Sequence, residues 1–192
     1  DAPGVLAHDE VPAPLLAVVL AAPGVVLDED ATVGGGHAVV QVVDLVHVAD
    51  DHPVVLEGIR SMLKPPFVVA ATATSAEGAL SQLQVSAFDI LLADYSMNGM
   101  PAADFIRRAL EIQPGLRVAV LSVHDDASVV REVINAGASA FVNKQDTLGE
   151  VIDALSSVLE GRVYLSRSVA GALTQPAGPV LTLRETEILK LI

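Results

Sequence analysis

The sequence of 192 residues contains no cysteine, few aromatic residues and few basic residues. The absence of cysteine excludes disulfides, thiolate metal sites and cysteine nucleophiles, and it fits a reducing compartment. Because only 3% of the residues are aromatic while 52% are hydrophobic, the core must be built mainly from Val, Leu, Ile and Ala. The 11 basic residues against 24 acidic ones give a net charge of -13, which argues against a general nucleic-acid-binding surface.

Residues 1–41 differ in composition from the rest of the chain. Their apolar stretch "VPAPLLAVVLAAPGVV" is interrupted by prolines and is too short to cross a bilayer as a helix. The first basic residue is Arg60, so the basic segment that opens a secretory signal is missing. Acidic residues 28–30 and glycines 34–36 are typical of a flexible connection. We therefore expect residues 1–41 to be a disordered extension of a cytoplasmic protein with no membrane role.

From residue 42 onward, short β-branched runs alternate with helical patterns. This alternation is typical of repeated βαβ units around a parallel sheet. The last helix opens with Thr147 and Glu150, the pattern of a capping box, and glycines 137 and 161 are placed to end helices. We predict an α/β domain over residues 42–163 with a doubly wound, five-stranded parallel sheet of the flavodoxin-like type. The strands are expected at 42–49, 67–72, 88–94, 117–122 and 139–143, and the helices at 54–64, 75–84, 101–112, 127–137 and 147–161.

The residues that follow the predicted strands carry most of the chemical information. The first strand ends in Asp50 and Asp51, the third in Asp94 and the fourth in Ser122, while Lys144 follows the fifth. Ligands of such sheets bind outside the carboxyl ends of the strands, so we expect these side chains to meet at one edge. Carboxylates crowded together are unfavourable unless a proton or a cation neutralises them, and Mg²⁺ prefers oxygen ligands. The pattern predicts a divalent-metal site.

Each of these residues, taken alone, has a more ordinary explanation. An aspartate after a strand is usually a helix N-cap, and Asp50 or Asp51 could cap the helix that starts near Pro53. A single serine at a strand end is most often a turn residue, and a single lysine is most often solvated. Together, however, three acids, a hydroxyl and a lysine at the ends of four strands are difficult to explain as independent coincidences.

Several longer stretches resemble a known family. "VADDHPVVLEGIRSML", "DILLADYSMNGM", "AVLSVHDDASVVREVINAGASAFVNK" and "LTLRETEILKLI" are similar to two-component response regulators of the NarL/FixJ type. Such proteins have a receiver domain followed by a LuxR-type helix-turn-helix domain. The resemblance covers residues 43–163 and 181–192. Residues 164–180 are mostly small and contain proline and glycine, which predicts an interdomain linker. The resemblance implies that residues 181–192 are the truncated start of the helix-turn-helix domain.

The resemblance implies a role for the acidic residues at the strand ends. Asp94 would be the phosphoacceptor. Asp51 would bind Mg²⁺ directly, Asp50 largely through water, and the backbone carbonyl of Ser96 would complete the protein ligands. The metal and the nearby charges suit phosphoryl transfer, in which positioning and charge neutralisation supply most of the catalysis.

Three further residues match positions of the family. Ser122 matches the hydroxyl that hydrogen-bonds the attached phosphoryl group, and Lys144 matches the lysine that pairs with its oxygens. Phe141 lies where the family places a switch aromatic, although a core role for it on the fifth strand is nearly as well supported. Asn98 departs from the family, in which the loop after the phosphoacceptor usually carries a proline.

The resemblance also implies partners and an output. A histidine kinase or phosphotransfer protein would supply the phosphoryl group, and a homodimer is a further candidate assembly. DNA would be bound only by a full-length form with the complete C-terminal domain, since this chain lacks a recognition helix and is strongly acidic. We expect no enzymatic activity beyond self-catalysed phosphorylation and dephosphorylation.

Three alternative functions are weighed against this one. A Mg²⁺-dependent phosphohydrolase with an aspartyl nucleophile usually needs a second acid two residues later, where this chain has Ser96, and a nucleophile on the first strand. A flavodoxin needs a phosphate-binding loop after the first strand, where two acids would repel phosphate. A docking module that is never phosphorylated would not need the complete set of acids, hydroxyl and lysine.

Overall fold

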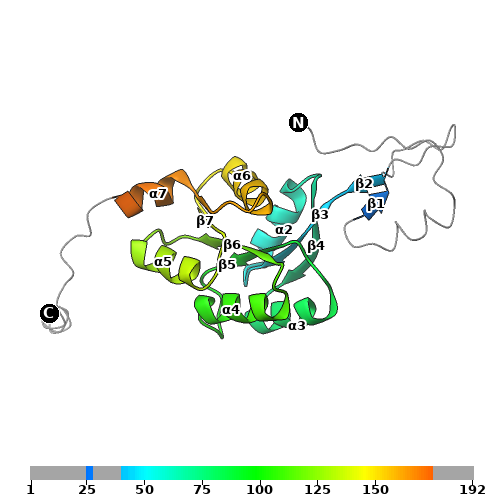
Figure 1. Cartoon of the computed structure of the whole chain (residues 1–192), viewed down its shortest axis with the longest axis horizontal. Coiled ribbons are helices and arrows are strands. Elements are labelled where there is room, and N and C mark those ends of the chain that lie inside the picture. Colours follow the sequence, from blue (N-terminus) through cyan, green and yellow to red (C-terminus); the bar gives the residue numbers. More distant parts are fainter. Residues whose placement is uncertain (1–24, 28–39, 175–192) are drawn as a thin grey trace, which may run out of the picture.

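The computed structural model describes residues 25–27 and 40–174, and its centre is a six-stranded, all-parallel sheet between two layers of helices (Figure 1). The strand order is β4-β3-β5-β6-β7-β8. The sheet strands are β3 (Asp44–Ala49), β4 (Phe67–Ala73), β5 (Ile90–Asp94), β6 (Arg117–Ser122), β7 (Ala140–Asn143) and β8 (Tyr164–Leu165). A separate antiparallel pair precedes them, formed by β1 (Val25–Leu27) and β2 (Val40–Val42).

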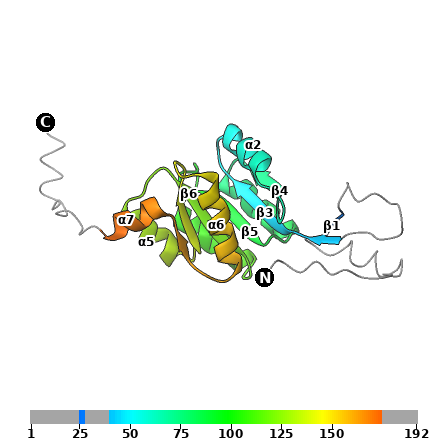
Figure 2. The same ribbon diagram turned by 90° about the horizontal axis from the view of Figure 1, so that it is seen from above.

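The helices are distributed over both faces of the sheet. One face is covered by α2 (Pro53–Met62) and α6 (Leu148–Leu159), which lie in front of the strands in Figure 2. The opposite face is covered by α3 (Ala76–Val85), α4 (Ala102–Ile112) and α5 (Ala127–Asn135). A last helix, α7 (Arg167–Thr174), lies beside α5 and β7 (Figure 1).

Alternation along the strands explains why both faces are covered. Successive side chains of a strand point to opposite faces, so a strand that is apolar at every position needs a helix on each side. In β5, Ile90 and Leu92 pack with α2 and α6, whereas Leu91 and Ala93 pack with α3, α4 and α5. All five residues of β5 are buried, as expected for the central strand.

The predicted fold class and the five predicted strands are confirmed, and the sheet has one strand more than predicted. Residues 164–174, which the sequence assigns to a linker, form β8 and α7. The sixth strand has only two residues, and its pairing with Ala140 and Phe141 is a backbone contact to a distant part of the chain. A strand of two residues is too short to show the alternating hydrophobic pattern from which strands are predicted.

The predicted helix ends agree with the structure in part. Gly137 and Gly161 adopt positive φ angles of 110° and 76° after α5 and α6, as glycines that end helices often do. Thr147 is the N-cap of α6, but its side chain makes no capping hydrogen bond. The expected capping box does not form, and the Glu150 carboxylate accepts a hydrogen bond from the Tyr164 hydroxyl.

Two predicted segments lie wholly or largely outside the described residues. These are the extension over residues 1–41, of which only 25–27, 40 and 41 are described, and the helix-turn-helix start at residues 181–192. Within the described ranges, no helix combines the length and apolar character that crossing a membrane requires.

Candidate functional site

The structure brings the sequence-predicted residues to the carboxyl edge of the sheet. Asp50 follows β3 directly, Asp94 ends β5, Ser122 ends β6, and Lys144 follows β7. The strands hold these residues through their backbones: the Asp50 N–H donates to the Ala73 carbonyl at 3.0 Å, and the Lys144 N–H donates to the Ser122 carbonyl at 2.7 Å. Parallel pairing therefore assembles groups that are up to 94 residues apart in the chain.

Lys144 lies between two buried carboxylates. Its Nζ is 2.7 Å from Asp50 Oδ2 and 3.0 Å from Asp94 Oδ2. The aspartate side chains are 1% and 3% exposed, so the ammonium is their main local counter-charge. Burial by itself would lower the pKa of Lys144, but its hydrogen bonds and charge interactions with Asp50 and Asp94 outweigh burial and raise the pKa. Lys144 is therefore a cation at neutral pH.

The acidic residues also offer ligands to a second cation. Oxygens of Asp50, Asp51 and Asp94 and a ring nitrogen of His52 all lie within 4.8 Å of one another. Asp51 Oδ1 is buried and accepts no hydrogen bond among the described residues, although His52 Nδ1 is 2.8 Å away. A buried carboxylate oxygen without a hydrogen bond is costly unless a cation contacts it. The donor set therefore fits a divalent ion that prefers oxygen ligands.

Backbone N–H groups fix the orientation of the Asp94 carboxylate and of the Ser122 hydroxyl. The Ser96 N–H donates to Asp94 Oδ1 at 3.2 Å, while Asp94 Oδ2 contacts Lys144. Ser122 is fully buried, and its Oγ accepts a hydrogen bond from the His124 N–H at 2.9 Å. That bond joins the serine hydroxyl to the loop between β6 and α5.

Two contacts at the site were missed by the sequence reasoning. Asn98 Nδ2 donates to Asp51 Oδ2 at 3.0 Å, so the residue that departs from the family pattern contacts an acid of the cluster. Tyr95, next to Asp94, donates its hydroxyl hydrogen to Glu132 Oε2 on α5 at 3.3 Å. The position of Tyr95 beside the predicted phosphoacceptor was visible in the sequence, but its partner 37 residues away was not.

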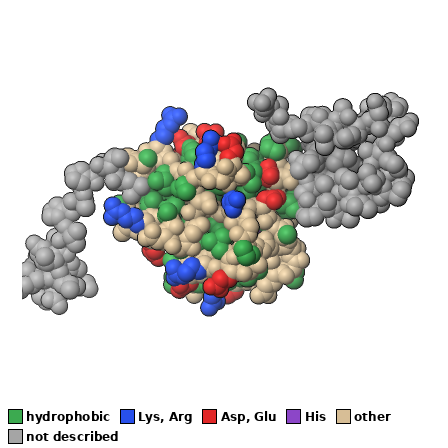
Figure 3. Space-filling view, viewed as in Figure 1, with side chains coloured by type: hydrophobic (Ala, Val, Ile, Leu, Met, Phe, Trp, Pro, Cys, Tyr) green, Lys and Arg blue, Asp and Glu red, His purple; other side chains and the backbone are tan. Residues whose placement is uncertain are grey.

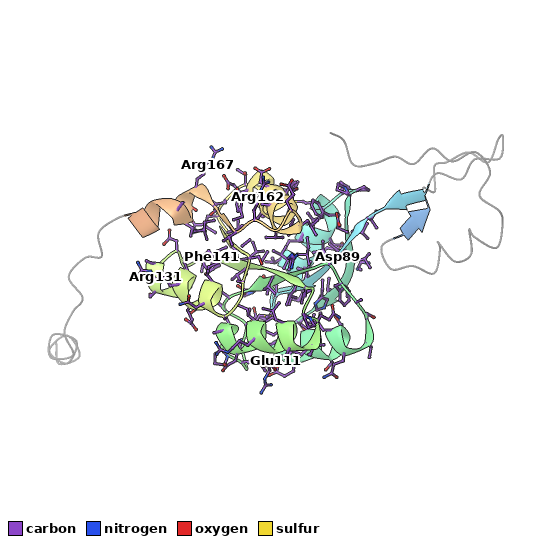
Figure 4. The ribbon with its side chains drawn as sticks, in the orientation of Figure 1. Asp89, Glu111, Arg131, Phe141, Arg162 and Arg167 are labelled. Atoms are coloured by element: carbon purple, nitrogen blue, oxygen red, sulfur yellow. The ribbon has the colours of Figure 1, made fainter. Side chains whose placement is uncertain are left out.

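Phe141 occupies the middle of the molecule rather than the site edge. Figure 4 shows its side chain between the sheet and α5, and it is fully buried. It packs in the cluster that includes Val130 and Val133 of α5. The core role is therefore confirmed, whereas a switch role for Phe141 stays a prediction.

Other surfaces of the described residues offer no competing arrangement of this kind. An open hollow at the amino edge of the sheet is lined by Phe88, Asp89, Gln113, Arg117 and neighbouring residues, and it includes none of the predicted site residues. Figure 3 shows acidic and basic side chains interspersed over one face, without a continuous basic stripe among the residues drawn in colour.

Comparison with known proteins agrees with this geometry. Residues 46–156 match the model of the response regulator receiver domain. The probable transcriptional regulatory protein NarL of Mycobacterium tuberculosis is 31% identical over 156 residues, which is 77% of this chain and 72% of that protein. UhpA of Salmonella typhimurium, also a transcriptional regulatory protein, is 30% identical over 145 residues, covering 74% of this chain and 72% of that protein.

Solved structures of response regulators are also similar to this chain. The isolated REC domain of RcsB from Salmonella enterica serovar Typhimurium, determined with the phosphomimetic BeF3-, has a TM-score of 0.64 at 25% identity. It matches 68% of this chain and 99% of that domain. A LuxR-family two-component response regulator from Aurantimonas has a TM-score of 0.65 at 26% identity, over 68% of this chain and 95% of that one. The chain therefore belongs to the response regulators, and it carries the receiver domain of a family that controls transcription.

Proposed function

We propose that Asp94 accepts a phosphoryl group from a histidine kinase or phosphotransfer protein in a Mg²⁺-dependent reaction, and that the domain then changes conformation to control transcriptional output. The observation that carries this proposal is the Lys144 ammonium between Asp50 and Asp94, beside a buried Asp51 oxygen that accepts no hydrogen bond from the described residues. A fixed cation and a cluster of oxygen ligands around one carboxylate suit phosphoryl transfer.

Four groups would hold the metal ion. They are the carboxylates of Asp50, Asp51 and Asp94 and the backbone carbonyl of Ser96. When bound, Mg²⁺ would neutralise phosphoryl charge and align the oxygens for displacement.

The chain's own residues prepare the nucleophile. The Ser96 N–H and the Lys144 ammonium each contact one oxygen of Asp94, which restricts rotation of the carboxylate. A carboxylate oxygen forms the new bond to phosphorus while the bond from phosphorus to the donor breaks, and the donor atom keeps that electron pair. The transition state of phosphoryl transfer is loose, with little bonding to the attacking and leaving atoms. Positioning and fixed positive charge therefore lower the barrier.

The product changes the balance of charge at the site. The acyl phosphate carries more negative charge than the carboxylate, so Lys144 has a new partner that competes with Asp50. The Ser122 hydroxyl can donate its hydrogen to a phosphoryl oxygen while its Oγ still accepts from His124. Movement of Ser122 would therefore displace the start of the loop before α5 and bias an existing equilibrium of conformations.

Partners and location follow from the proposed chemistry. The chain would act in the cytoplasm, where a kinase reaches Asp94, and a homodimer is a candidate active form. DNA binding belongs to a full-length form with a complete C-terminal domain. The phosphohydrolase alternative is less well supported because Ser96, whose side chain is exposed, stands where the second acid is needed, and because Asp94 lies on the third of the five predicted strands.

Acetyl phosphate labelling tests this proposal. The chain is incubated with acetyl phosphate and Mg²⁺, and incorporation is followed by intact-mass spectrometry. We expect one phosphoryl group per chain in the wild type and in the control Asp89→Asn, whose side chain is exposed at the opposite edge of the sheet, and none in Asp94→Asn. Labelling of Asp94→Asn at the wild-type level would show that the acceptor is another residue, and an unlabelled wild type would favour the docking module.

A further inference from the structure

Residues 164–171, which we call the strap, are built into the receiver domain. The Tyr164 N–H donates to the Ser139 carbonyl at 2.9 Å, and the Ser166 N–H donates to the Phe141 carbonyl at 3.0 Å. Val169 is fully buried in the same apolar cluster as Phe141. Figures 1 and 2 both place the first turn of α7 beside α5. The strap thus supplies the edge strand β8 and pairs with β7, which leads directly into Lys144.

A chain of polar contacts joins the strap to the turn that follows β7. Ser168 Oγ donates to Asp146 Oδ2 at 2.9 Å, and the Asn143 N–H donates to the same oxygen at 3.2 Å. The Asn143 N–H also lies 3.4 Å from Ser166 Oγ, which is 3.1 Å from Ser168 Oγ. One carboxylate oxygen of Asp146 therefore binds both the strap and the end of β7.

The turn that contains Asp146 also positions Lys144. The Asp146 N–H donates to the Asn143 carbonyl, and the Gln145 N–H donates to Asn143 Oδ1, both at 2.9 Å. These bonds close the turn over residues 143–146, and the Lys144 ammonium leaves it towards Asp50 and Asp94. Because the turn is short and closed by its own hydrogen bonds, a shift of the lysine backbone is expected to displace Asp146.

We propose that Asp146 and Ser168 are positioning residues that couple Lys144 to the strap, so that phosphorylation of Asp94 weakens the docking of the strap. The proposal rests on the proposed function, because phosphorylation supplies the new partner that draws Lys144 away from Asp50. It adds an output route through the strap, which leads towards the C-terminal part of the chain. Coupling between two sites is reciprocal, so loss of strap docking must favour binding of a phosphoryl mimic at Asp94.

A neighbouring contact supplies a matched control. The Arg167 side chain is 95% exposed, projects from the start of α7 in Figure 4, and lies 3.5 Å from Glu150 on α6. This ion pair lies on the strap but does not contact the turn at residues 143–146. Because the Arg167 side chain is almost fully exposed to solvent, this pair contributes little to the docking of the strap. Arg167→Ala therefore alters the strap without breaking the proposed connection.

The experiment combines hydrogen exchange with titration of a phosphoryl mimic. Amide exchange of residues 164–171 is measured with and without beryllofluoride and Mg²⁺, and the affinity for beryllofluoride is measured for the wild type, Ser168→Ala, Ser168→Thr and Arg167→Ala. Labelling of Asp94 by acetyl phosphate is recorded in parallel for each protein.

The coupling predicts four results. Beryllofluoride raises strap exchange in the wild type about three- to tenfold, the range that corresponds to the net contribution of one typical intramolecular hydrogen bond. Ser168→Ala exchanges faster before the mimic is added and binds it about three- to tenfold more tightly. Ser168→Thr, which keeps the hydroxyl, restores the wild-type affinity. Arg167→Ala leaves the affinity unchanged.

Contrary results separate the two proposals. If Asp94 is labelled but the mimic leaves strap exchange unchanged, or if Ser168→Ala binds the mimic no more tightly than the wild type, the coupling is wrong and the proposed function stands. If the wild type neither takes up label nor binds beryllofluoride, the proposed function fails and the coupling fails with it.

Discussion

Replacing Lys144 with methionine tests the electrostatics of the site. The side chain keeps most of its length, but the ammonium that lies 2.7 Å from Asp50 and 3.0 Å from Asp94 is lost. The two carboxylates would then be 1% and 3% exposed without a close counter-charge. Removing one partner of a buried ion pair typically costs about 3–5 kcal/mol. Because the Lys144 side chain is itself 17% exposed, we expect a loss of about 2–4 kcal/mol in EDTA.

The assay is thermal unfolding with and without Mg²⁺. The loss in EDTA corresponds to a fall in Tm of roughly 5–15 °C for a chain of this size. Mg²⁺ should bind Lys144→Met more tightly than the wild type, since no ammonium competes for the carboxylates, and at a hundredfold excess over Kd it restores about 2.7 kcal/mol. Lys64→Met, at an exposed lysine, serves as the control and should change stability by less than about 0.5 kcal/mol. A variant as stable as the wild type in EDTA, or one that Mg²⁺ stabilises less than the wild type, would refute this reasoning.

Three further predictions concern the fold. Burial lowers the pKa of His47 below its ordinary 6.5, against an opposing hydrogen bond. The contribution of neutral His47 to stability should therefore be fully present above pH 6.5 and be lost as the pH falls further, because the unfolded chain takes up a proton that the folded chain does not. His47→Leu should reduce this pH dependence in urea unfolding at pH 7.5 and 5.5, and an unchanged pH dependence would contradict the assignment. Phe141→Ala should cost about 3–5 kcal/mol in urea unfolding, since the ring is fully buried, and a loss below about 1 kcal/mol would show that the ring is not part of the core. Gly137→Ala should lower the Tm clearly, because the φ of Gly137 is 110° and the new Cβ would lie 2.5 Å from a leucine side chain of α4. The new Cβ of Gly115→Ala meets nothing within 4 Å, so this control should change the Tm little. Equal effects of the two substitutions on the Tm would contradict the strain argument.

The convergence of the site residues could be predicted because it depends on a simple rule. Asp50, Asp94, Ser122 and Lys144 each follow or end a strand, and the strands alternate with helices, so their carboxyl ends had to meet at one edge. The sequence could not show which groups contact each other. That Lys144 bridges Asp50 and Asp94, and that Asn98 contacts Asp51, depends on side-chain geometry across separate loops.

The segment after α6 marks the limit of sequence reasoning. Residues 164–171 contain small and polar residues with proline and glycine further on, a composition typical of linkers. The structure of this segment depends on backbone pairing with β7 and on two buried side chains, Ser166 and Val169. Tyr164, whose backbone pairs with β7, donates its hydroxyl hydrogen to Glu150, which was predicted to take part in the capping box of α6. Long-range contacts overrode the local pattern in both cases.

Fluorine NMR of beryllofluoride gives the most direct test of the central claim, that Asp94 is the acceptor in a site completed by Mg²⁺ and Lys144. The mimic is added to the full chain with Mg²⁺, and bound fluorine signals are sought. The account predicts bound signals in the wild type, their loss when EDTA removes the metal, and their loss in Asp94→Asn but not in Asp89→Asn. Bound signals that persist in Asp94→Asn, or that do not need Mg²⁺, would contradict it.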